Sequence, residues 1–194
     1  MKAGLVDLKP IYQVVRANPT CYDFSERPKI PRYRKQAEQV VAQVPDLKGV
    51  YLWGKYDRRC YWSSIYFGLA GLGKTKYRLK SRLLEELMDE KSCFWRICRS
   101  KKHIIKARDD GQKARRRAVR KRGATHIIWV ATPKLRKRQV REVEADLIEA
   151  LNPVANVVRA TPPSHIQKDA TAIYNAFRKV IHTHRGDACP VYVK

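Results

Sequence analysis

Glu144 stands within the apolar stripe of a predicted helix. Between Arg138 and Leu151 the apolar residues recur at helical spacing, and the face that they form with Glu144 holds Val140, Val143, Leu147, Ile148 and Leu151. An ionised carboxylate on a buried face is costly unless it is paired or binds a metal ion. Two interpretations therefore stay open for Glu144, namely a buried salt bridge to Arg78 or Arg82, or a metal ligand.

Two tyrosines, Tyr51 and Tyr66, fall in segments that predict an antiparallel hairpin. Residues 49–53 and 60–68 are rich in β-forming side chains and flank the polar stretch 55–59. Because side chains alternate between the two faces of a strand, this hairpin brings the two phenols to the same face of the sheet. Strand tyrosines are either packing residues or, beside cations that lower a phenol pKa from ~10, acid–base groups.

Residues 68–75 match the phosphate-binding pattern G-x-x-x-x-G-K-[ST] between a predicted strand and a predicted helix. An NTPase of that class also needs an acidic residue at the end of a second apolar strand to hold magnesium. The strand at 127–131 runs instead into Thr132 and Pro133. We interpret the glycines as a strand-to-helix turn, and we predict no nucleotide cofactor.

These residues must be positioned by a small set of elements. Apolar periodicity predicts helices over residues 33–44, 77–89, 92–107, 138–151 and 166–181, and strands over residues 49–53, 60–68 and 125–131. The order of these elements around a small sheet indicates an α+β or α/β sandwich, and we predict the α+β class. We divide the chain into a basic N-terminal arm (1–45), a core (46–159) with a basic insertion (99–124), and a C-terminal helical extension (160–194).

The overall charge indicates a polyanionic partner. The chain has 194 residues, with 42 lysines and arginines against 18 aspartates and glutamates, a net charge of +24. Such a charge repels itself unless a polyanion is near, so nucleic acid is the leading partner class. With 44% apolar residues the chain folds around one core and is not a disordered tail.

No segment resembles a membrane span or a signal peptide, so we predict no membrane partner and a cytoplasmic or nucleoid-associated, non-secreted protein. The five cysteines form no C-x-x-C pair, and we expect them to be reduced.

Four blocks of sequence resemble the GIY-YIG nuclease superfamily. They are Gly49-Val50-Tyr51, Tyr66-Phe67-Gly68, Leu79-Lys80-Ser81-Arg82-Leu83, and Glu144-x-x-Leu147-Ile148-x-x-x-x-Pro153-x-x-Asn156. They occur in the order typical of that superfamily and cover about residues 48–159. The resemblance implies a small three-stranded antiparallel sheet flanked by helices.

The resemblance also implies metal-dependent hydrolysis of DNA phosphodiester bonds. Tyr51 would act as general base, Tyr66 would orient water or phosphate, and Arg82 would stabilise charge on the phosphoryl group. Glu144 would hold a single Mg²⁺ ion. Structural positions near the site would be Gly49, Gly68, Pro153 and Asn156.

The sequence departs from the superfamily pattern between the blocks. Fourteen residues, 52–65, separate the two triplets, which predicts an extended hairpin turn. The segment after Gly68 is also long, and the catalytic arginine is therefore either Arg82 or Arg78, one helical turn apart.

The basic segments have no counterpart in a minimal domain. Residues 99–122 hold 12 lysines and arginines against 2 aspartates. We expect these residues, the N-terminal arm and the C-terminal helix to grip DNA, with phosphate contacts from Lys74, Arg78, Arg115, Arg116, Arg117 and Arg120. RNA stays open as a substrate, and the alternative to an endonuclease is a non-catalytic DNA- or RNA-binding protein of the same fold.

Overall fold

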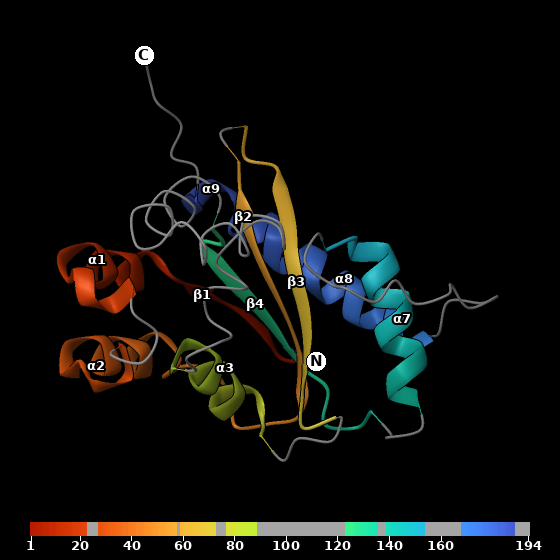
Figure 1. The fold of residues 1–194 in the computed structure, drawn as a ribbon. Coiled ribbons are helices and arrows are strands. Elements are labelled where there is room, and N and C mark those ends of the chain that lie inside the picture. The colour runs from red at the N-terminus through yellow and green to blue at the C-terminus, as the bar shows by residue number, and fades with distance from the viewer. Residues whose placement is uncertain are drawn as a thin grey trace, which may run out of the picture.

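A four-stranded antiparallel sheet forms the centre of the molecule (Figure 1). The computed structural model describes residues 1–22, 27–57, 59–72, 77–88, 123–135, 139–153 and 168–188. The strands are β1 (Ala3–Asp7), β2 (Gly49–Tyr56), β3 (Trp62–Ala70) and β4 (His126–Ala131), in the spatial order β1-β4-β2-β3. The predicted α+β class is confirmed, but the predicted sheet lacked one strand.

The additional strand, β1, comes from the N-terminal arm. It pairs with β4 from Ala3 opposite Val130 to Asp7 opposite His126. The helices α1 (Lys9–Ala17) and α2 (Pro31–Val40) follow, with the short 3-10 turns η1 (Pro19–Tyr22) and η2 (Arg27–Lys29) between them. The strand β1 and the helices α1 and α2 of the N-terminal arm therefore contribute to the core. A strand of only five residues carries too short an alternation to be recognised from its pattern.

In the hairpin, β2 is longer than predicted, β3 has the predicted length but lies two residues later in the chain, and the turn is shorter. Backbone pairing continues from Gly49 opposite Ala70 to Tyr56 opposite Trp62, with an irregularity between Trp53 and Gly54. In the turn, the Asp57 carboxylate accepts hydrogen bonds from the backbone N–H of Tyr61 (2.9 Å) and Arg59 (2.8 Å). Most of the residues between the two tyrosines thus belong to the strands and not to the loop.

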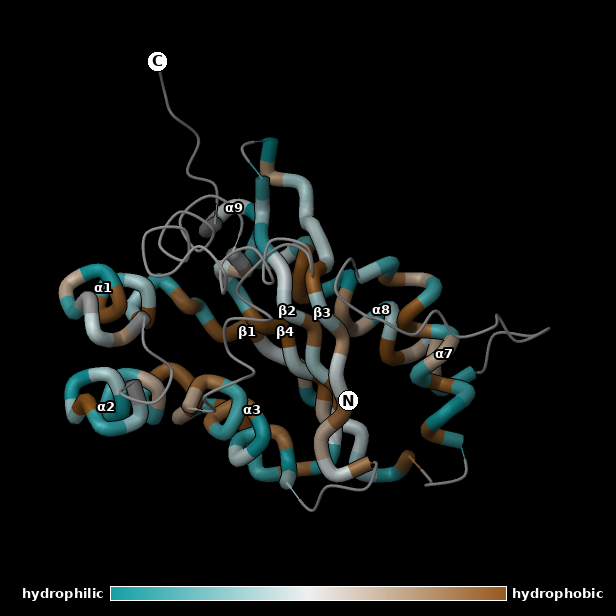
Figure 2. Tube along the Cα trace, viewed as in Figure 1, coloured by the Kyte–Doolittle hydropathy of each residue, from teal (hydrophilic) through white to brown (hydrophobic). Residues whose placement is uncertain are grey.

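Helices cover both faces of the sheet (Figure 1). One apolar layer joins Tyr51 and Trp53 of β2 to α1, α2 and α3 (Leu79–Met88). The second joins Val50 and Leu52 of β2 to α7 (Val140–Leu151) and α8 (Lys168–Thr183), which is followed by the short α9 (Arg185–Ala188). Apolar residues follow the strands and the inner helix faces in Figure 2. The sheet therefore separates two cores.

The ends of α7 agree with the sequence pattern. Asn152 adopts a left-handed conformation with φ of 42°, and its backbone N–H donates to the carbonyl of Ile148. Asparagine tolerates this conformation, and the following Pro153 cannot continue the helix.

Two further sequence expectations have different outcomes. Cys60 takes part in a disulfide, so the expected reduced state is wrong for this residue, while Cys21 is a buried thiol. Within the described ranges no helix is long and apolar enough to cross a membrane. The predicted helix over 92–107 and residues 99–122 of the basic insertion lie outside the described residues.

Candidate active site

Tyr51 lies in the middle of β2 and points into the apolar layer beneath α3. Its side chain is 1% exposed, and its hydroxyl group donates a hydrogen bond to Glu86 Oε1 at 2.5 Å. A phenol buried in this way needs a polar partner for its hydroxyl group. Glu86, itself fully buried on α3, is that partner.

Arg82 completes a polar cluster with Tyr51 and Glu86. Arg82 Nε donates to the Tyr51 hydroxyl at 3.4 Å, and Arg82 Nη2 lies 3.1 Å from Glu86 Oε1. Arg82 Nη1 lies 2.5 Å from Glu85 Oε2. Arg82 and Glu86 are four residues apart, so one helix face presents them both to the same strand residue. We call Tyr51, Arg82, Glu85 and Glu86 the tyrosine–arginine cluster.

Neighbouring groups stabilise the charged form of the Arg82 guanidinium. Burial by itself lowers the pKa of the guanidinium, but the carboxylate of Glu86, with further contributions from Tyr51 and Glu85, outweighs it. The pKa of Arg82 therefore lies above its ordinary value, and a fixed cation stands beside the phenol.

Two glycines make room for this cluster. A Cβ atom at Gly68, opposite Tyr51 on β3, would overlap the phenol ring. A Cβ atom at Gly49 would overlap both the Leu79 side chain of α3 and the carbonyl oxygen of Val130. The glycines of the two triplets thus permit Tyr51 to lie across β3 and α3 to lie against β2.

Tyr66 lies on the same sheet face as Tyr51, as predicted. The centres of the two rings are 6.4 Å apart, at an interplanar angle of 46°. Tyr66 is only partly buried, whereas Tyr51 is buried. The predicted convergence of the two phenols is confirmed in geometry.

The structure separates the two candidate arginines. Arg82 contacts Tyr51, whereas Arg78 donates to the backbone carbonyl of Asp46 at 3.1 Å and lies 3.8 Å from the Asp46 carboxylate. Arg78 is also exposed. Neither arginine pairs with Glu144, so the buried salt bridge that we considered for that residue is wrong.

Glu144 lies on the opposite side of the sheet from Tyr51. It is half-buried on α7, the helix whose apolar residues pack on Val50, Leu52 and Phe67. Burial raises the pKa of its carboxyl group. The structure therefore does not bring Glu144 together with Tyr51, Tyr66 and Arg82, as the resemblance implied. Adjacent residues of β2 face opposite sides of the sheet, and α3 and α7 pack on opposite sides of it.

The donors beside Tyr51 do not fit a Mg²⁺ ion. Glu85 and Glu86 are the carboxylates of the cluster, and both are bonded to Arg82. Across the described part of the chain, no three His, Cys, Asp or Glu residues are grouped so that they could hold a metal ion. A cation at Tyr51 would have to share these carboxylates with the guanidinium of Arg82, whose positive charge would repel it.

The other predicted site residues divide into two groups. Pro153 is buried directly after α7. The remaining ones lie outside the described residues: Lys74, Arg115, Arg116, Arg117, Arg120 and Asn156. Glu86 was not among the predicted site residues, although the sequence holds a signal for it. It falls among Leu79, Leu83 and Leu87 on the apolar face of α3, just as Glu144 falls within its own stripe.

Comparison with models of protein families, with curated proteins and with solved structures finds no match for this chain.

Proposed function

We propose that the protein is a GIY-YIG-type endonuclease that hydrolyses DNA phosphodiester bonds at the tyrosine–arginine cluster. The observation that carries this proposal is the contact between Tyr51 and Arg82. These residues come from two separate blocks of the resemblance, and they meet with Tyr66 on the same sheet face. The net charge of +24 supports a nucleic-acid substrate.

The cluster suits proton transfer from water to a general base. Tyr51 hands its phenol proton to Glu86, to which it is already hydrogen-bonded at 2.5 Å, and accepts a proton from the attacking water. The water oxygen bonds to phosphorus as a bridging P–O bond breaks, and the leaving alkoxide takes up a proton from solvent. Arg82 stabilises the phenolate that exists between these transfers and the negative charge that develops on the phosphoryl group. Its side chain is 21% exposed, so the cluster reaches solvent at the guanidinium.

Tyr66 supplies a second phenol beside Tyr51, and this partly exposed side chain orients the water or a phosphate oxygen. Glu86 is a positioning residue, because it acts through Tyr51. No step of this chemistry passes through the Mg²⁺ ion that the resemblance implies. We place the enzyme in the cytoplasm or on the nucleoid, where DNA is present.

A second candidate function is binding of nucleic acid without cleavage. It is favoured by one observation, the position of Glu144 across the sheet from Tyr51. In this alternative the tyrosine–arginine cluster holds α3 on the sheet and performs no chemistry.

Cleavage of plasmid DNA decides between the two functions. We expect the wild-type chain to nick supercoiled plasmid, Arg82→Ala to lose this activity, and Arg78→Ala to retain most of it, because only Arg82 contacts Tyr51. Absence of nicking with Mg²⁺ present would favour the non-catalytic alternative. Equal loss in both variants would contradict the assignment of Arg82.

A parallel reaction with a chelator tests the metal requirement. If nicking continues in the presence of the chelator, the tyrosine–arginine cluster cleaves DNA without a metal ion. Nicking that is lost supports the Mg²⁺ prediction, with ligands other than the cluster carboxylates. The same reaction on labelled RNA tests whether the substrate is restricted to DNA.

A further inference from the structure

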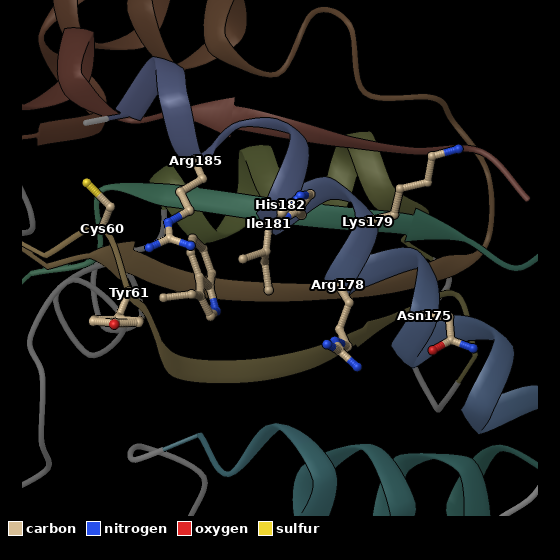
Figure 3. Close-up of a pocket in the computed structure, with 9 residues that line it drawn as sticks. Cys60, Tyr61, Asn175, Arg178, Lys179, Ile181, His182 and Arg185 are labelled. Carbon is tan, nitrogen blue, oxygen red and sulfur yellow. The ribbon is translucent and has the colours of Figure 1, made fainter. Parts of the chain in front are cut away.

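A basic and aromatic pocket lies between the tip of the β2–β3 hairpin and α8, away from the tyrosine–arginine cluster (Figure 3). Its volume is about 460 Å³, within the range of small-molecule sites. The hairpin supplies Tyr61 and Trp62, α8 supplies Arg178, Lys179 and His182, and α9 supplies Arg185. We call this cavity the hairpin pocket.

The helix side of the pocket is an exposed polar face. Asn175, Arg178, Lys179 and His182 recur at helical spacing and are all exposed, whereas Ile173, Phe177 and Val180 face the core. The pocket lining includes no carboxylate, and within the described residues none forms an ion pair with these cations. An ordinary solvated helix face mixes the two charges.

The hairpin side of the pocket presents an aromatic ring. Tyr61 is 60% exposed, an unusual position for a large aromatic side chain, and the Arg185 guanidinium lies 5.4 Å from its ring centre. This cation–π contact holds the ring in place while much of it stays open to solvent. The Tyr56 hydroxyl group donates to the carbonyl of Ile181 at 2.7 Å, which ties the hairpin to α8.

Cations beside an open aromatic ring are the features that bind single-stranded nucleic acid. Bases of an unpaired strand stack on aromatic rings, and the strand's phosphates bind lysine and arginine. In a duplex the bases are already stacked on one another, so an isolated tyrosine gains little from them. A site for phosphate alone would not need Tyr61.

We propose that the hairpin pocket binds an unpaired nucleic-acid strand, with a base on Tyr61 and phosphates on Arg178 and Lys179. This inference rests on the proposed function only in that nucleic acid is the substrate. It implies that the protein prefers DNA that contains a single-stranded segment.

Fluorescence anisotropy with a labelled single strand of about 12 nucleotides, a length within the usual site sizes, tests the stacking contact. Chelator is present throughout, so that binding is measured without cleavage. We expect Tyr61→Ala to weaken binding of the single strand about 10-fold and binding of a matched duplex less than 2-fold. Tyr77→Ala is the matched control, because Tyr77 is also exposed (48%) but lies outside the pocket.

The phosphate contacts are tested by the salt dependence of the same binding. Replacing both Arg178 and Lys179 by Ala should flatten the slope of log affinity against log salt by about 1.4, because each contact to a single strand contributes about 0.7. As a control for the lost charge, Arg32 and Lys35 are both replaced by Ala. They are exposed residues of α2 on the other side of the sheet, and this variant should flatten the slope less.

Equal effects of Tyr61→Ala and Tyr77→Ala, or equal weakening of single strand and duplex by Tyr61→Ala, would overturn the proposal. The proposal would also be overturned if the Arg178/Lys179 variant and the α2 control flattened the slope of log affinity against log salt equally. A chain that binds as expected but never nicks plasmid would contradict the proposed nuclease activity and leave the hairpin pocket intact.

Discussion

At the scale of single residues, the environments of two glutamates decide what each one does. Glu86 is fully buried, yet it is bonded to Tyr51 and Arg82, so its position is compensated by an opposite charge and a donor. Glu144 is half-buried, and burial raises its carboxyl pKa. The apolar stripe of α7 predicted the position of Glu144, whereas Glu86 was not predicted. The partner of each carboxylate is set by tertiary packing that no local pattern contains.

Glu144→Gln should stabilise the fold at neutral pH. The carboxyl pKa is raised above its ordinary value of 4.5 in the folded protein, so ionisation of Glu144 destabilises the fold at pH values above 4.5. This destabilisation disappears as the pH falls below 4.5. We therefore expect a higher Tm for the variant at pH 7 and no difference near pH 4, measured by thermal unfolding in chelator. A wild-type Tm that rises with Mg²⁺, with no such rise in the variant, would instead identify Glu144 as a metal ligand.

At the scale of elements, strands and helices with a clear period were predictable, and their relative placement was not. The patterns located β2, β3, β4, α3, α7 and α8 to within a few residues. They missed β1 and α1, which are short, and they left the faces covered by α3 and α7 undetermined. Only the three-dimensional structure assigns α3 to the face with Tyr51 and α7 to the face with Val50.

The close approach of β3 to Tyr51 depends on Gly68. Gly68→Ala would place a Cβ atom in the phenol ring, and overpacking of this kind costs about 1–3 kcal/mol. We expect a lower midpoint of urea unfolding and reduced plasmid nicking, because Tyr51 must move. Gly186→Ala serves as the control, because nothing lies within 4 Å of a Cβ atom there. Equal stability of the two variants would contradict the assigned contact.

At the scale of the whole molecule, most of the positive charge lies away from the tyrosine–arginine cluster, the proposed catalytic site. The tyrosine–arginine cluster contains two carboxylates and one cation, so the net charge of +24 resides elsewhere. The densest basic segment, 99–122, lies outside the described residues, and the hairpin pocket adds further cations. Grip on the substrate should therefore be separable from cleavage.

Neutralising Arg115, Arg116, Arg117 and Arg120 tests this separation. If these residues contact duplex phosphates, the slope of log affinity against log salt should flatten by roughly 3 to 4, because each contact contributes about 0.9. Binding should weaken equally on unrelated DNA sequences, while single-turnover cleavage at saturating enzyme stays unchanged. An unchanged slope would show that the segment does not follow the DNA backbone.

The central claim, that Tyr51 is the general base of a nuclease, is tested most directly by the single-turnover cleavage rate of Tyr51→Phe. The control is Tyr33→Phe, which removes another buried hydroxyl group, one that donates to the carbonyl of Leu87 at 2.6 Å in the same core. Our account predicts a loss on the order of 100-fold or more for Tyr51→Phe and an almost unchanged rate for Tyr33→Phe. Equal cleavage rates for wild type and Tyr51→Phe would contradict it and reduce Tyr51 to a packing residue.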